Sequence, residues 1–196
     1  MRFDGAQEGR RTERGVRGKA LGAATELLAR CGMERLSIRT IAARAGIGIS
    51  SMYHHFPTKE ELLLQIAIVG FQSLARDMEA APAMDAALTP FGRAARVFLD
   101  NVATKAPLYH LMFNEHLMAH HESLRAAERE AFAVFSSAVA MDDRFPDAIA
   151  ENLSLMLWTL GRGMAASAAS RPDGQLTAEF RASVGRAMGY LIDRRL

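Results

Sequence analysis

The 196-residue sequence contains a single cysteine, Cys31, so no disulfide can form within the chain. Long apolar runs are also missing, because the most apolar stretches fall well short of the roughly 18 residues that a membrane-spanning helix needs. The first residues include several charged side chains and lack the apolar run of a secretion signal. These absences argue against a disulfide-stapled secreted protein and against a membrane protein. We therefore expect a cytoplasmic protein with no membrane partner.

The sequence also lacks the alternation of apolar and polar residues that is typical of a half-buried β-strand. Apolar residues instead recur at helical spacing along nearly the whole chain. Hydrophobic residues make up 49% of the sequence and charged residues 23%, which is enough apolar surface for a packed core. We predict an all-α fold in a chain long enough for a small domain joined to a larger one.

Charge is divided unevenly along the chain. Residues 1–59 hold 11 lysines and arginines against 5 aspartates and glutamates, a net charge of +6. Residues 60–196 hold 13 against 17, a net charge of −4. A basic first third attached to an acidic remainder suggests that the N-terminal end meets a polyanion such as nucleic acid. Chance variation in solvated surface charge explains the asymmetry equally well.

Turn residues divide the apolar pattern into helices. Gly32 stands just past the first periodic stretch, where a C-terminal glycine is expected, and Ser37 is placed to cap the next helix. Gly46 provides a tight turn, and Thr58 begins a capping-box sequence that includes Glu61. We predict helices over residues 12–31, 38–45, 49–55, 58–81, 90–105, 107–119, 123–141, 146–170 and 177–194, with a linker over 82–89.

Residues 38–55 have the outline of a helix-turn-helix unit, with two short helices joined by a glycine-containing turn and preceded by a longer apolar-faced helix. If the second short helix begins near Ile49, then Met52 and Phe56 face inward. Lys59, at the start of the next helix, adds a positive charge that favours a phosphate. The side chains left toward solvent are hydrogen-bonding types suited to base edges and phosphates, namely Ser50, Ser51, Tyr53, His54 and His55.

One segment, from Leu36 to Leu62, combines Ile41-Ala42, Ala45-Gly46, Tyr53, His55-Phe56 and Lys59-Glu60. This combination resembles the DNA-binding domain of the TetR, or tetracycline-repressor, family. The resemblance implies three N-terminal helices followed by a helical domain that binds a small-molecule effector and forms a homodimer through its last two helices. It divides the chain into a DNA-binding helix-turn-helix domain over residues 1–60, with a basic N-terminal arm, and an effector-binding and dimerisation domain over 61–196. It further implies a transcriptional regulator, usually a repressor that leaves a palindromic operator.

Carried over by position, the resemblance implies DNA contacts from both short helices and from the start of the helix after them. Two residues depart from the family pattern, because Gly48 stands where a Ser or Thr cap is usual and Ser50 where Gly is frequent. A glycine cap costs only a few tenths of a kcal/mol relative to serine, so the helix should form. Tyr53 has an alternative role in packing, and His54 as plain solvated surface. The implied contacts are Ser37, Arg39, Thr40, Ser50, Ser51, Tyr53, His54, His55 and Lys59.

Four arginines precede or open the first predicted helix: Arg10, Arg11, Arg14 and Arg17. One interpretation is an arm that contacts the phosphate backbone or the minor groove. The other is a disordered tail with solubilising charge. The sequence favours neither.

The C-terminal part carries aromatic and methionine residues at helical spacing. In a helical sensor domain, side chains between the helices line the ligand pocket, and mostly apolar ones predict a hydrophobic or aromatic small molecule. The alternative is that these residues only form core. Segments around Pro107 and Trp158 resemble a TetR C-terminal subtype marked by a Trp followed by His-Gly, although Arg162 replaces the histidine. The candidate pocket residues are Phe71, Phe98, Met112, Phe113, His116, Phe132, Phe135, Met156 and Trp158.

A histidine group supports a rival hypothesis, a metal-binding sensor or a metal-dependent enzyme. His116 and His120 lie four residues apart and would share one helix face, a spacing suitable for two metal ligands. The sequence places no third ligand, and it lacks the His-Glu-x-x-His, Ser/His/Asp and glycine-rich phosphate motifs of common enzymes. We therefore expect no catalysis and no cofactor, with the metal site as the alternative. The group consists of His110, His116, His120 and His121 with Glu115.

The last two predicted helices each carry an apolar stripe, which includes Leu157 in the first and Met188 in the second. Small residues such as Gly161 and Ala165 would permit close approach of a neighbouring helix. Two such helices from each of two chains would make a four-helix bundle, and we expect a homodimer of this kind. The alternative is that the stripes only complete the core of each subunit.

Overall fold

The computed structural model describes residues 5–33, 35–80, 88–171 and 176–193, and every regular element in these ranges is a helix. The predicted all-α fold is confirmed. The chain divides into two compact units, Met1–Ala67 and Ile68–Leu196. The linker predicted over residues 82–89 lies mostly outside the described residues. Across the described ranges, every helix is too short or too polar to cross a bilayer.

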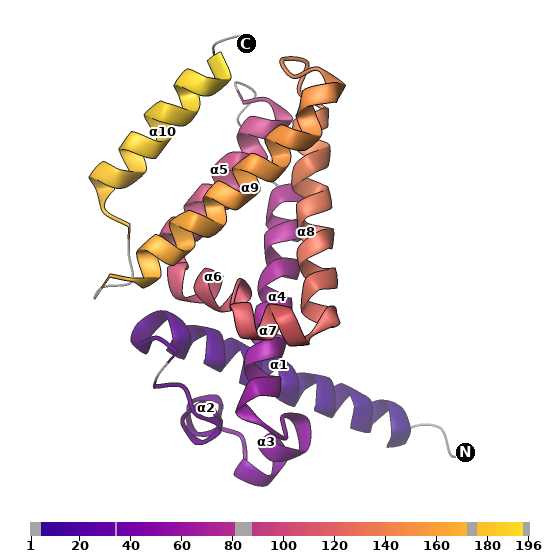
Figure 1. Ribbon diagram of the computed structural model, residues 1–196. Coiled ribbons are helices and arrows are strands. Elements are labelled where there is room, and N and C mark those ends of the chain that lie inside the picture. Colours follow the sequence, from indigo (N-terminus) through magenta and orange to yellow (C-terminus); the bar gives the residue numbers. More distant parts are fainter. Residues whose placement is uncertain (1–4, 34, 81–87, 172–175, 194–196) are drawn as a thin grey trace. The chain divides into compact units, whose positions relative to one another are not determined.

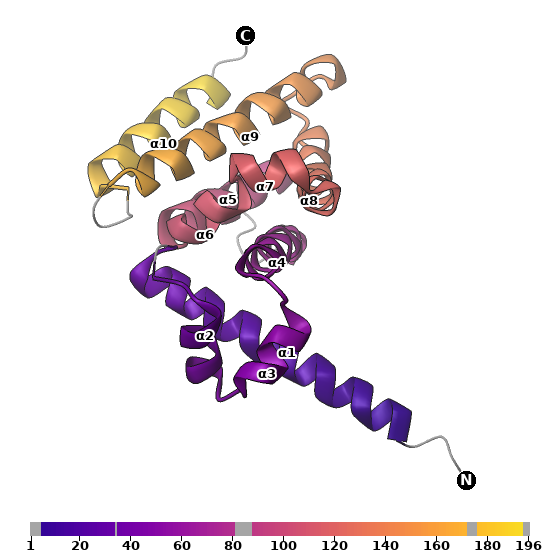
Figure 2. The same ribbon diagram turned by 60° about the horizontal axis from the view of Figure 1, so that its bottom comes forward.

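The first unit contains α1 (Gly5–Cys31), α2 (Ile38–Ala45), α3 (Ile49–His55) and the start of α4 (Lys59–Glu79). Figures 1 and 2 show α2 and α3 as two short helices packed beside the long α1. Ala20, Ala24 and Leu28, spaced by four, are fully buried and form the inward stripe of α1. Gly32, with φ of +70°, ends α1 as expected, because a left-handed residue cannot continue the helix.

The boundaries of α1 differ from the prediction. We predicted that the first helix begins at Thr12, but α1 begins at Gly5, so Arg10, Arg11 and Arg14 lie on a helix. No proline interrupts residues 5–12, and the helix therefore extends through them. The side chains of Arg10, Arg11 and Arg14 lie outside the described part of the chain.

The second unit contains the rest of α4 followed by α5 (Pro90–Thr104), α6 (Ala106–Met112), α7 (Glu115–His120), α8 (Glu122–Ala140), α9 (Asp147–Ala169) and α10 (Ala178–Asp193). α9 packs on α5, α6 and α8, and α10 runs antiparallel beside it in both views (Figures 1 and 2). Residues 107–119 were predicted as one helix and form two. Asn114 accepts a hydrogen bond from the backbone N–H of Leu117 at 3.0 Å and thereby starts α7 as a new helix.

An aromatic core surrounds Trp158 of α9. The Phe98 ring stacks on the indole, with centroids 4.9 Å apart and planes 10° apart. Phe113, Phe132 and Phe135 contact the same indole with centroid separations of 6.2, 5.6 and 5.8 Å. The indole Nε1 donates to Oε1 of Glu128 at 3.2 Å, which satisfies its single buried donor. These contacts join α5, α6, α8 and α9 into one packed unit.

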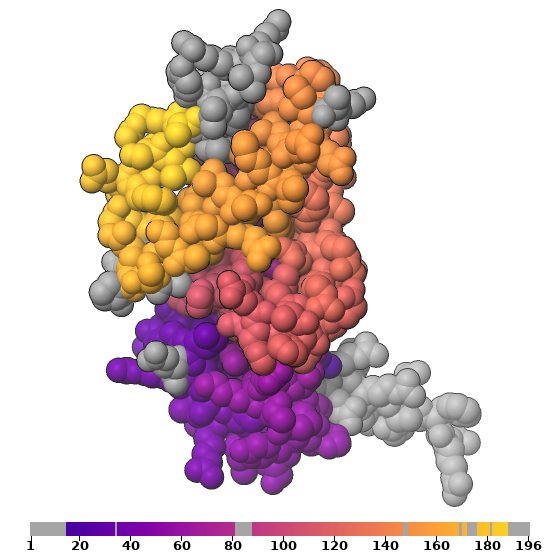
Figure 3. All heavy atoms as spheres, in the orientation of Figure 1, coloured from indigo at the N-terminus to yellow at the C-terminus, as the bar shows by residue number. Residues whose placement is uncertain are grey.

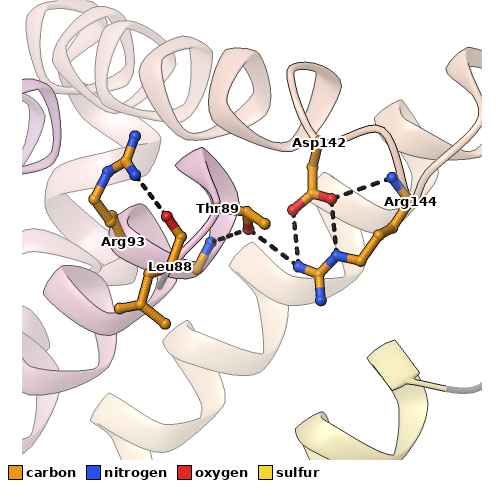
Figure 4. A network of polar contacts seen from close by, with 6 residues as sticks. Leu88, Thr89, Arg93, Asp142 and Arg144 are labelled. Atoms are coloured by element: carbon orange, nitrogen blue, oxygen red, sulfur yellow. Dashed lines mark hydrogen bonds and ion pairs between the residues drawn. The ribbon is translucent and has the colours of Figure 1, made fainter. Parts of the chain in front are cut away.

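A polar network ties the loop after α8 to the start of α5 (Figure 4). The guanidinium of Arg144 donates to both carboxylate oxygens of Asp142 at 2.8 Å and to Oγ1 of Thr89 at 3.1 Å. Thr89 also accepts from the backbone N–H of Gly92 and so caps α5. Hydrogen bonds from Arg144 lower the pKa of the buried Asp142 to about 2. The network therefore holds a charged pair at a helix start that the sequence pattern did not indicate.

Candidate nucleic-acid interface

The N-terminus of α2 is closed by a capping box built from Ser37 and Thr40. Oγ of Ser37 accepts from the backbone N–H of Thr40 at 3.1 Å, and Oγ1 of Thr40 accepts from the backbone N–H of Ser37 at 3.0 Å. The predicted cap at Ser37 is confirmed, and Thr40 supplies its second half. Thr40 Oγ1 also donates to the Ser37 carbonyl at 2.9 Å, so its hydroxyl is largely committed to the cap. A DNA contact at either residue stays a prediction.

The turn between α2 and α3 depends on Gly46, which takes φ of +65° and donates to the α2 carbonyls of Ala42 and Ala43. A residue with a Cβ is strained in that conformation, so the glycine sets the sharp angle between the two helices. Gly48 occupies the N-cap of α3 and has no side chain to cap with, yet α3 spans the predicted residues 49–55. The expected tolerance of a glycine cap is confirmed.

Helix α3 has one buried and one exposed face. Met52 is fully buried, as is Phe56 directly after the helix, and both pack inward as predicted. Tyr53 exposes 49% of its surface, and Ser50 and His54 are exposed beside it. Ser51 and His55 are half-buried. The outward face thus carries short or planar hydrogen-bonding groups on a rigid support, which is the arrangement that reads base edges in a major groove.

Thr58 directly precedes α4, and its Oγ1 accepts from the backbone N–H of Glu61 at 3.0 Å. This bond is the first half of the predicted capping box. Oε1 of Glu61 accepts a hydrogen bond from Gln65 at 3.0 Å. Lys59, the first residue of α4, is exposed, and so is Arg39 of α2. Both cations are therefore accessible to a phosphate.

Two other basic residues of this unit have partners within it. The Arg17 guanidinium lies 5.9 Å from the centre of the Phe56 ring and donates to Gln65. Arg44 forms an ion pair with Glu26 of α1 at 2.5 Å. Arg17 was grouped with the arm arginines, but these contacts join α1 to the α3–α4 segment. A phosphate contact of the exposed Arg17 stays a prediction.

The residues predicted to line an effector pocket fall into two groups. Phe71, Phe98, Met112, Phe135 and Trp158 are buried in the second unit, while Phe113 and Phe132 are half-buried against the indole. Their rings contact one another, with Phe71 and Phe113 5.2 Å apart, so these side chains pack as core. The other two predicted members are exposed. Met156 is 49% exposed and His116 is exposed, because both lie on outward faces of their helices.

A cavity of about 510 Å³ lies instead between the α6–α7 segment and α9, and the sequence did not indicate it. Its walls bring together residues from helices that are far apart in the chain. Only Phe113 and His116 belong to the predicted pocket. His110 and Glu115 come from the histidine group, which the sequence analysis had assigned to a possible metal site and not to an effector pocket. The cavity is lined by His110, Phe113, Asn114, Glu115, His116, Thr159, Arg162, Gly163, Ala165 and Ala166.

The histidine group does not assemble into a metal centre within the described residues, where no three His, Cys, Asp or Glu side chains are placed to hold an ion. The imidazoles of His116 and His120 do lie together, with centroids 4.4 Å apart, as their spacing predicts. Nδ1 of His120 hydrogen-bonds to the His116 carbonyl at 2.8 Å. The rival metal hypothesis therefore lacks the third ligand it requires.

Comparisons with known proteins agree with this geometry. Residues 20–66 match the family model described as bacterial regulatory proteins, tetR family. A transcriptional regulator from Rhodococcus sp. RHA1 has a similar structure, with a TM-score of 0.67, 19% identity, and coverage of 90% of this chain and 95% of that one. A regulatory protein in the tetR family from Rhodococcus RHA1 is similar with a TM-score of 0.63 and 18% identity, over 90% of this chain and 95% of that one. The multidrug binding protein EbrR, complexed with imidazole, is similar with a TM-score of 0.55 and 22% identity, over 87% of this chain and 93% of that one. The curated protein sequences contain no match.

Proposed function

Because residues 20–66 match the model of the tetR family of bacterial regulatory proteins, we propose that this chain is a member of that family and a homodimeric, ligand-responsive repressor of transcription. The chain is a DNA-binding transcriptional regulator with an all-α fold and an N-terminal helix-turn-helix domain. The proposal adds a palindromic operator, release by a small molecule, a cytoplasmic location and the absence of catalysis. In this proposal the first unit reads DNA and the second binds the effector and the second protomer.

The observation that carries the proposal is the outward face of α3. Ser50, Tyr53 and His54 are exposed on a seven-residue helix whose opposite face is buried through Met52. A helix held in this way enters a major groove as a rigid body, so its polar side chains meet base edges at little further entropic cost. Lys59 and Arg39 supply the sequence-independent attraction to phosphate.

A second protomer is proposed to cover the outer surface of α9. Four large apolar side chains are exposed there: Ile149, Leu155, Met156 and Leu160, and Phe180 of α10 is exposed as well. Figure 3 shows α9, in orange, as a continuous strip of this surface with α10 beside it. Several large apolar side chains exposed on one helix are typical of a subunit interface. The exposed residues support a bundle of α9 and α10 with their counterparts.

The interface residues agree only in part with the apolar stripe chosen on the sequence, which held Ile149, Met156 and Leu160 together with Leu157. Leu157 is only 5% exposed and belongs to the core of its own protomer. Gly161 and Ala165 are also buried within the protomer. A Cβ on Gly161 would meet Phe98, so this glycine admits α5 and not a partner helix. The Met188 side chain lies outside the described ones. Leu155 takes the place of Leu157 in the proposed interface, beside Met156 and Leu160.

In the proposed effector response, α4 couples the effector site to the DNA-reading helix. This single helix carries Lys59 in the first unit and Phe71 in the second, where Phe71 packs on Phe113 at the end of α6. A ligand that prefers one arrangement of α6 would bias α4 and with it the DNA-reading helix. A typical coupling free energy of about 1 to 3 kcal/mol weakens operator binding about 5- to 150-fold, and bound DNA weakens the binding of the ligand by the same factor.

Selection of duplexes from a random library tests the DNA-reading role. We expect enriched sites with two similar half-sites about 34 to 36 Å apart, bound by two protomers. Tyr53→Ala should change the preferred sequence, whereas Arg96→Ala, an exposed cation of the second unit, should not. Selection that enriches no sequence, or a Tyr53→Ala protein with the wild-type preference, would contradict the proposal.

A further inference from the structure

We propose that the cavity between α6–α7 and α9 is the effector site and that it takes a small organic carboxylate with a flat apolar body. This inference rests on the proposed ligand-responsive function and adds a charged group to its ligand, since the candidate pocket side chains had predicted a hydrophobic or aromatic small molecule. The volume of about 510 Å³ lies within the range of small-molecule sites. The aromatic core around Trp158 is filled by its own rings, which pack against the indole.

Arg162 is the group that selects a carboxylate. Its guanidinium lies 5.0 Å from the centre of the Phe113 ring and 3.6 Å from Oε1 of Glu128. Glu128 is in turn held by the indole N–H of Trp158 at 3.2 Å. The guanidinium is therefore positioned before a ligand arrives, which lowers the entropic cost of binding. It remains 42% exposed, and a guanidinium has five N–H donors, of which this ion pair engages only part.

The other polar groups of the cavity also favour an acceptor. Oδ1 of Asn114 accepts from Leu117, so the donors of its amide remain for a ligand. His110 and His116 add imidazoles on the α6–α7 wall. Glu115 is the one acidic side chain among the lining residues, and it is exposed to solvent, where its repulsion is screened. The Arg162 guanidinium lies against the Phe113 ring, which also lines the cavity.

The apolar part of the lining suits a flat ligand. Gly163, Ala165 and Ala166 present little side-chain bulk along α9, and the half-buried Phe113 ring faces the same cavity. Nothing lies within 4 Å of a Cβ built on Gly163, which shows the open space beside the helix. A ring placed there would bury apolar surface while its carboxylate reached Arg162. The two requirements together define an aromatic or similarly flat carboxylate.

Calorimetry on the full-length protein with three probes of one shape tests the charge selection. The probes are 2-naphthoate, the neutral 2-naphthamide and the cationic 2-naphthylmethylammonium. We expect naphthoate to bind at least about tenfold more tightly than the amide, and the cation to bind most weakly. Arg162→Gln should remove this preference while leaving amide affinity unchanged, which also shows that the variant is folded. Arg162→Lys should keep part of the preference, because it retains charge but loses bidentate geometry.

Filling the cavity provides an independent variant. Ala166→Leu should weaken all three probes, with its oligomeric state checked by sedimentation because Ala166 lies on α9. Equal or tighter binding of the amide or the cation would overturn the proposed ligand class, and wild-type naphthoate affinity in Arg162→Gln would overturn the site. Operator affinity is measured in parallel. Naphthoate that binds through Arg162 and leaves operator affinity unchanged supports the site and counts against the ligand-responsive function.

Discussion

Phe98 of α5 lies flat against Trp158 of α9, with the two ring centroids 4.9 Å apart, and this stack depends on the absence of a side chain at Gly161. A Cβ at position 161 would stand 1.9 Å from a ring carbon of Phe98. Such a distance is impossible, so any larger residue must displace the ring. Glycine is thus required here by the close approach of α5 and not by backbone conformation.

Gly161→Ala should destabilise the protein by about 2 kcal/mol, because displacement of Phe98 outweighs the roughly 1 kcal/mol that alanine adds in helix propensity. Gly163→Ala, two residues along the same helix, is the matched control, since its Cβ meets nothing within 4 Å. We expect this control to be neutral or more stable by up to about 1 kcal/mol. Urea unfolding of both variants measures the difference, and equal stabilities would show that Phe98 adapts freely.

Asp142→Asn should lower the free energy of unfolding by about 1 to 2 kcal/mol at neutral pH. This value is smaller than the full pKa shift implies, because the Arg144 side chain is 41% exposed and solvent screens the pair. The pKa of Asp142 is lowered from 3.8 to about 2 in the folded protein, chiefly by Arg144. Its stabilisation is therefore present above about pH 4 and lost as pH falls from about 4 to 2. Unfolding curves across this range should be less pH-dependent for Asp142→Asn than for the wild type. Asp143→Asn, at the exposed neighbour, should follow the wild type.

Leu155→Glu should separate the proposed dimer while the protomer stays folded, because Leu155 is 58% exposed in the single chain. Leu157→Glu should instead unfold the protein, since it places a carboxylate in the protomer core. Sedimentation and circular dichroism distinguish the two effects. If both Leu155→Glu and Met156→Glu sediment as dimers, the interface does not use this face of α9.

Lys59→Ala should weaken binding to every duplex, whatever its sequence. It should also make the slope of log affinity against log salt concentration shallower by about 0.9 for each phosphate that Lys59 neutralises. Lys59 is exposed at the start of α4, directly after the DNA-reading helix. Tyr53→Phe removes a hydroxyl but no charge, and it should leave the salt slope unchanged. Titrations at several salt concentrations compare the two variants. An unchanged slope in Lys59→Ala would mean that this lysine binds no phosphate.

Tyr109→Phe should raise stability by about 1 kcal/mol, because among the described residues none gives the buried Tyr109 hydroxyl a hydrogen-bond partner. Burial, with a smaller contribution from the Asp77 carboxylate, raises the pKa of Tyr109 well above its ordinary value. We therefore also expect this phenol to remain protonated in alkaline solution where exposed tyrosines ionise. A decrease of more than about 1 kcal/mol in the stability of the variant would show that the hydroxyl has a partner after all.

The local features of the first unit were predictable from the sequence. The ends of α2 and α3, the Ser37 cap and the Gly46 turn depend on hydrogen bonds and dihedral angles within a few residues. Such interactions are encoded by neighbours in the chain, so short sequence patterns identify them. The inward positions of Met52 and Phe56 followed from helical spacing, because a short helix on a core has one buried face.

In the second unit, sequence alone determined that helices form and roughly where most of them lie, while tertiary structure decided which side chains are core, cavity and surface. Met156 and Leu157 are adjacent apolar residues, yet the first is exposed and the second buried, because α5 and α8 cover only one side of α9. The break at Asn114 and the cavity beside Arg162 likewise arise where separate helices meet. Packing between segments far apart in the chain sets these features, and helical periodicity carries no information about which neighbour covers which face.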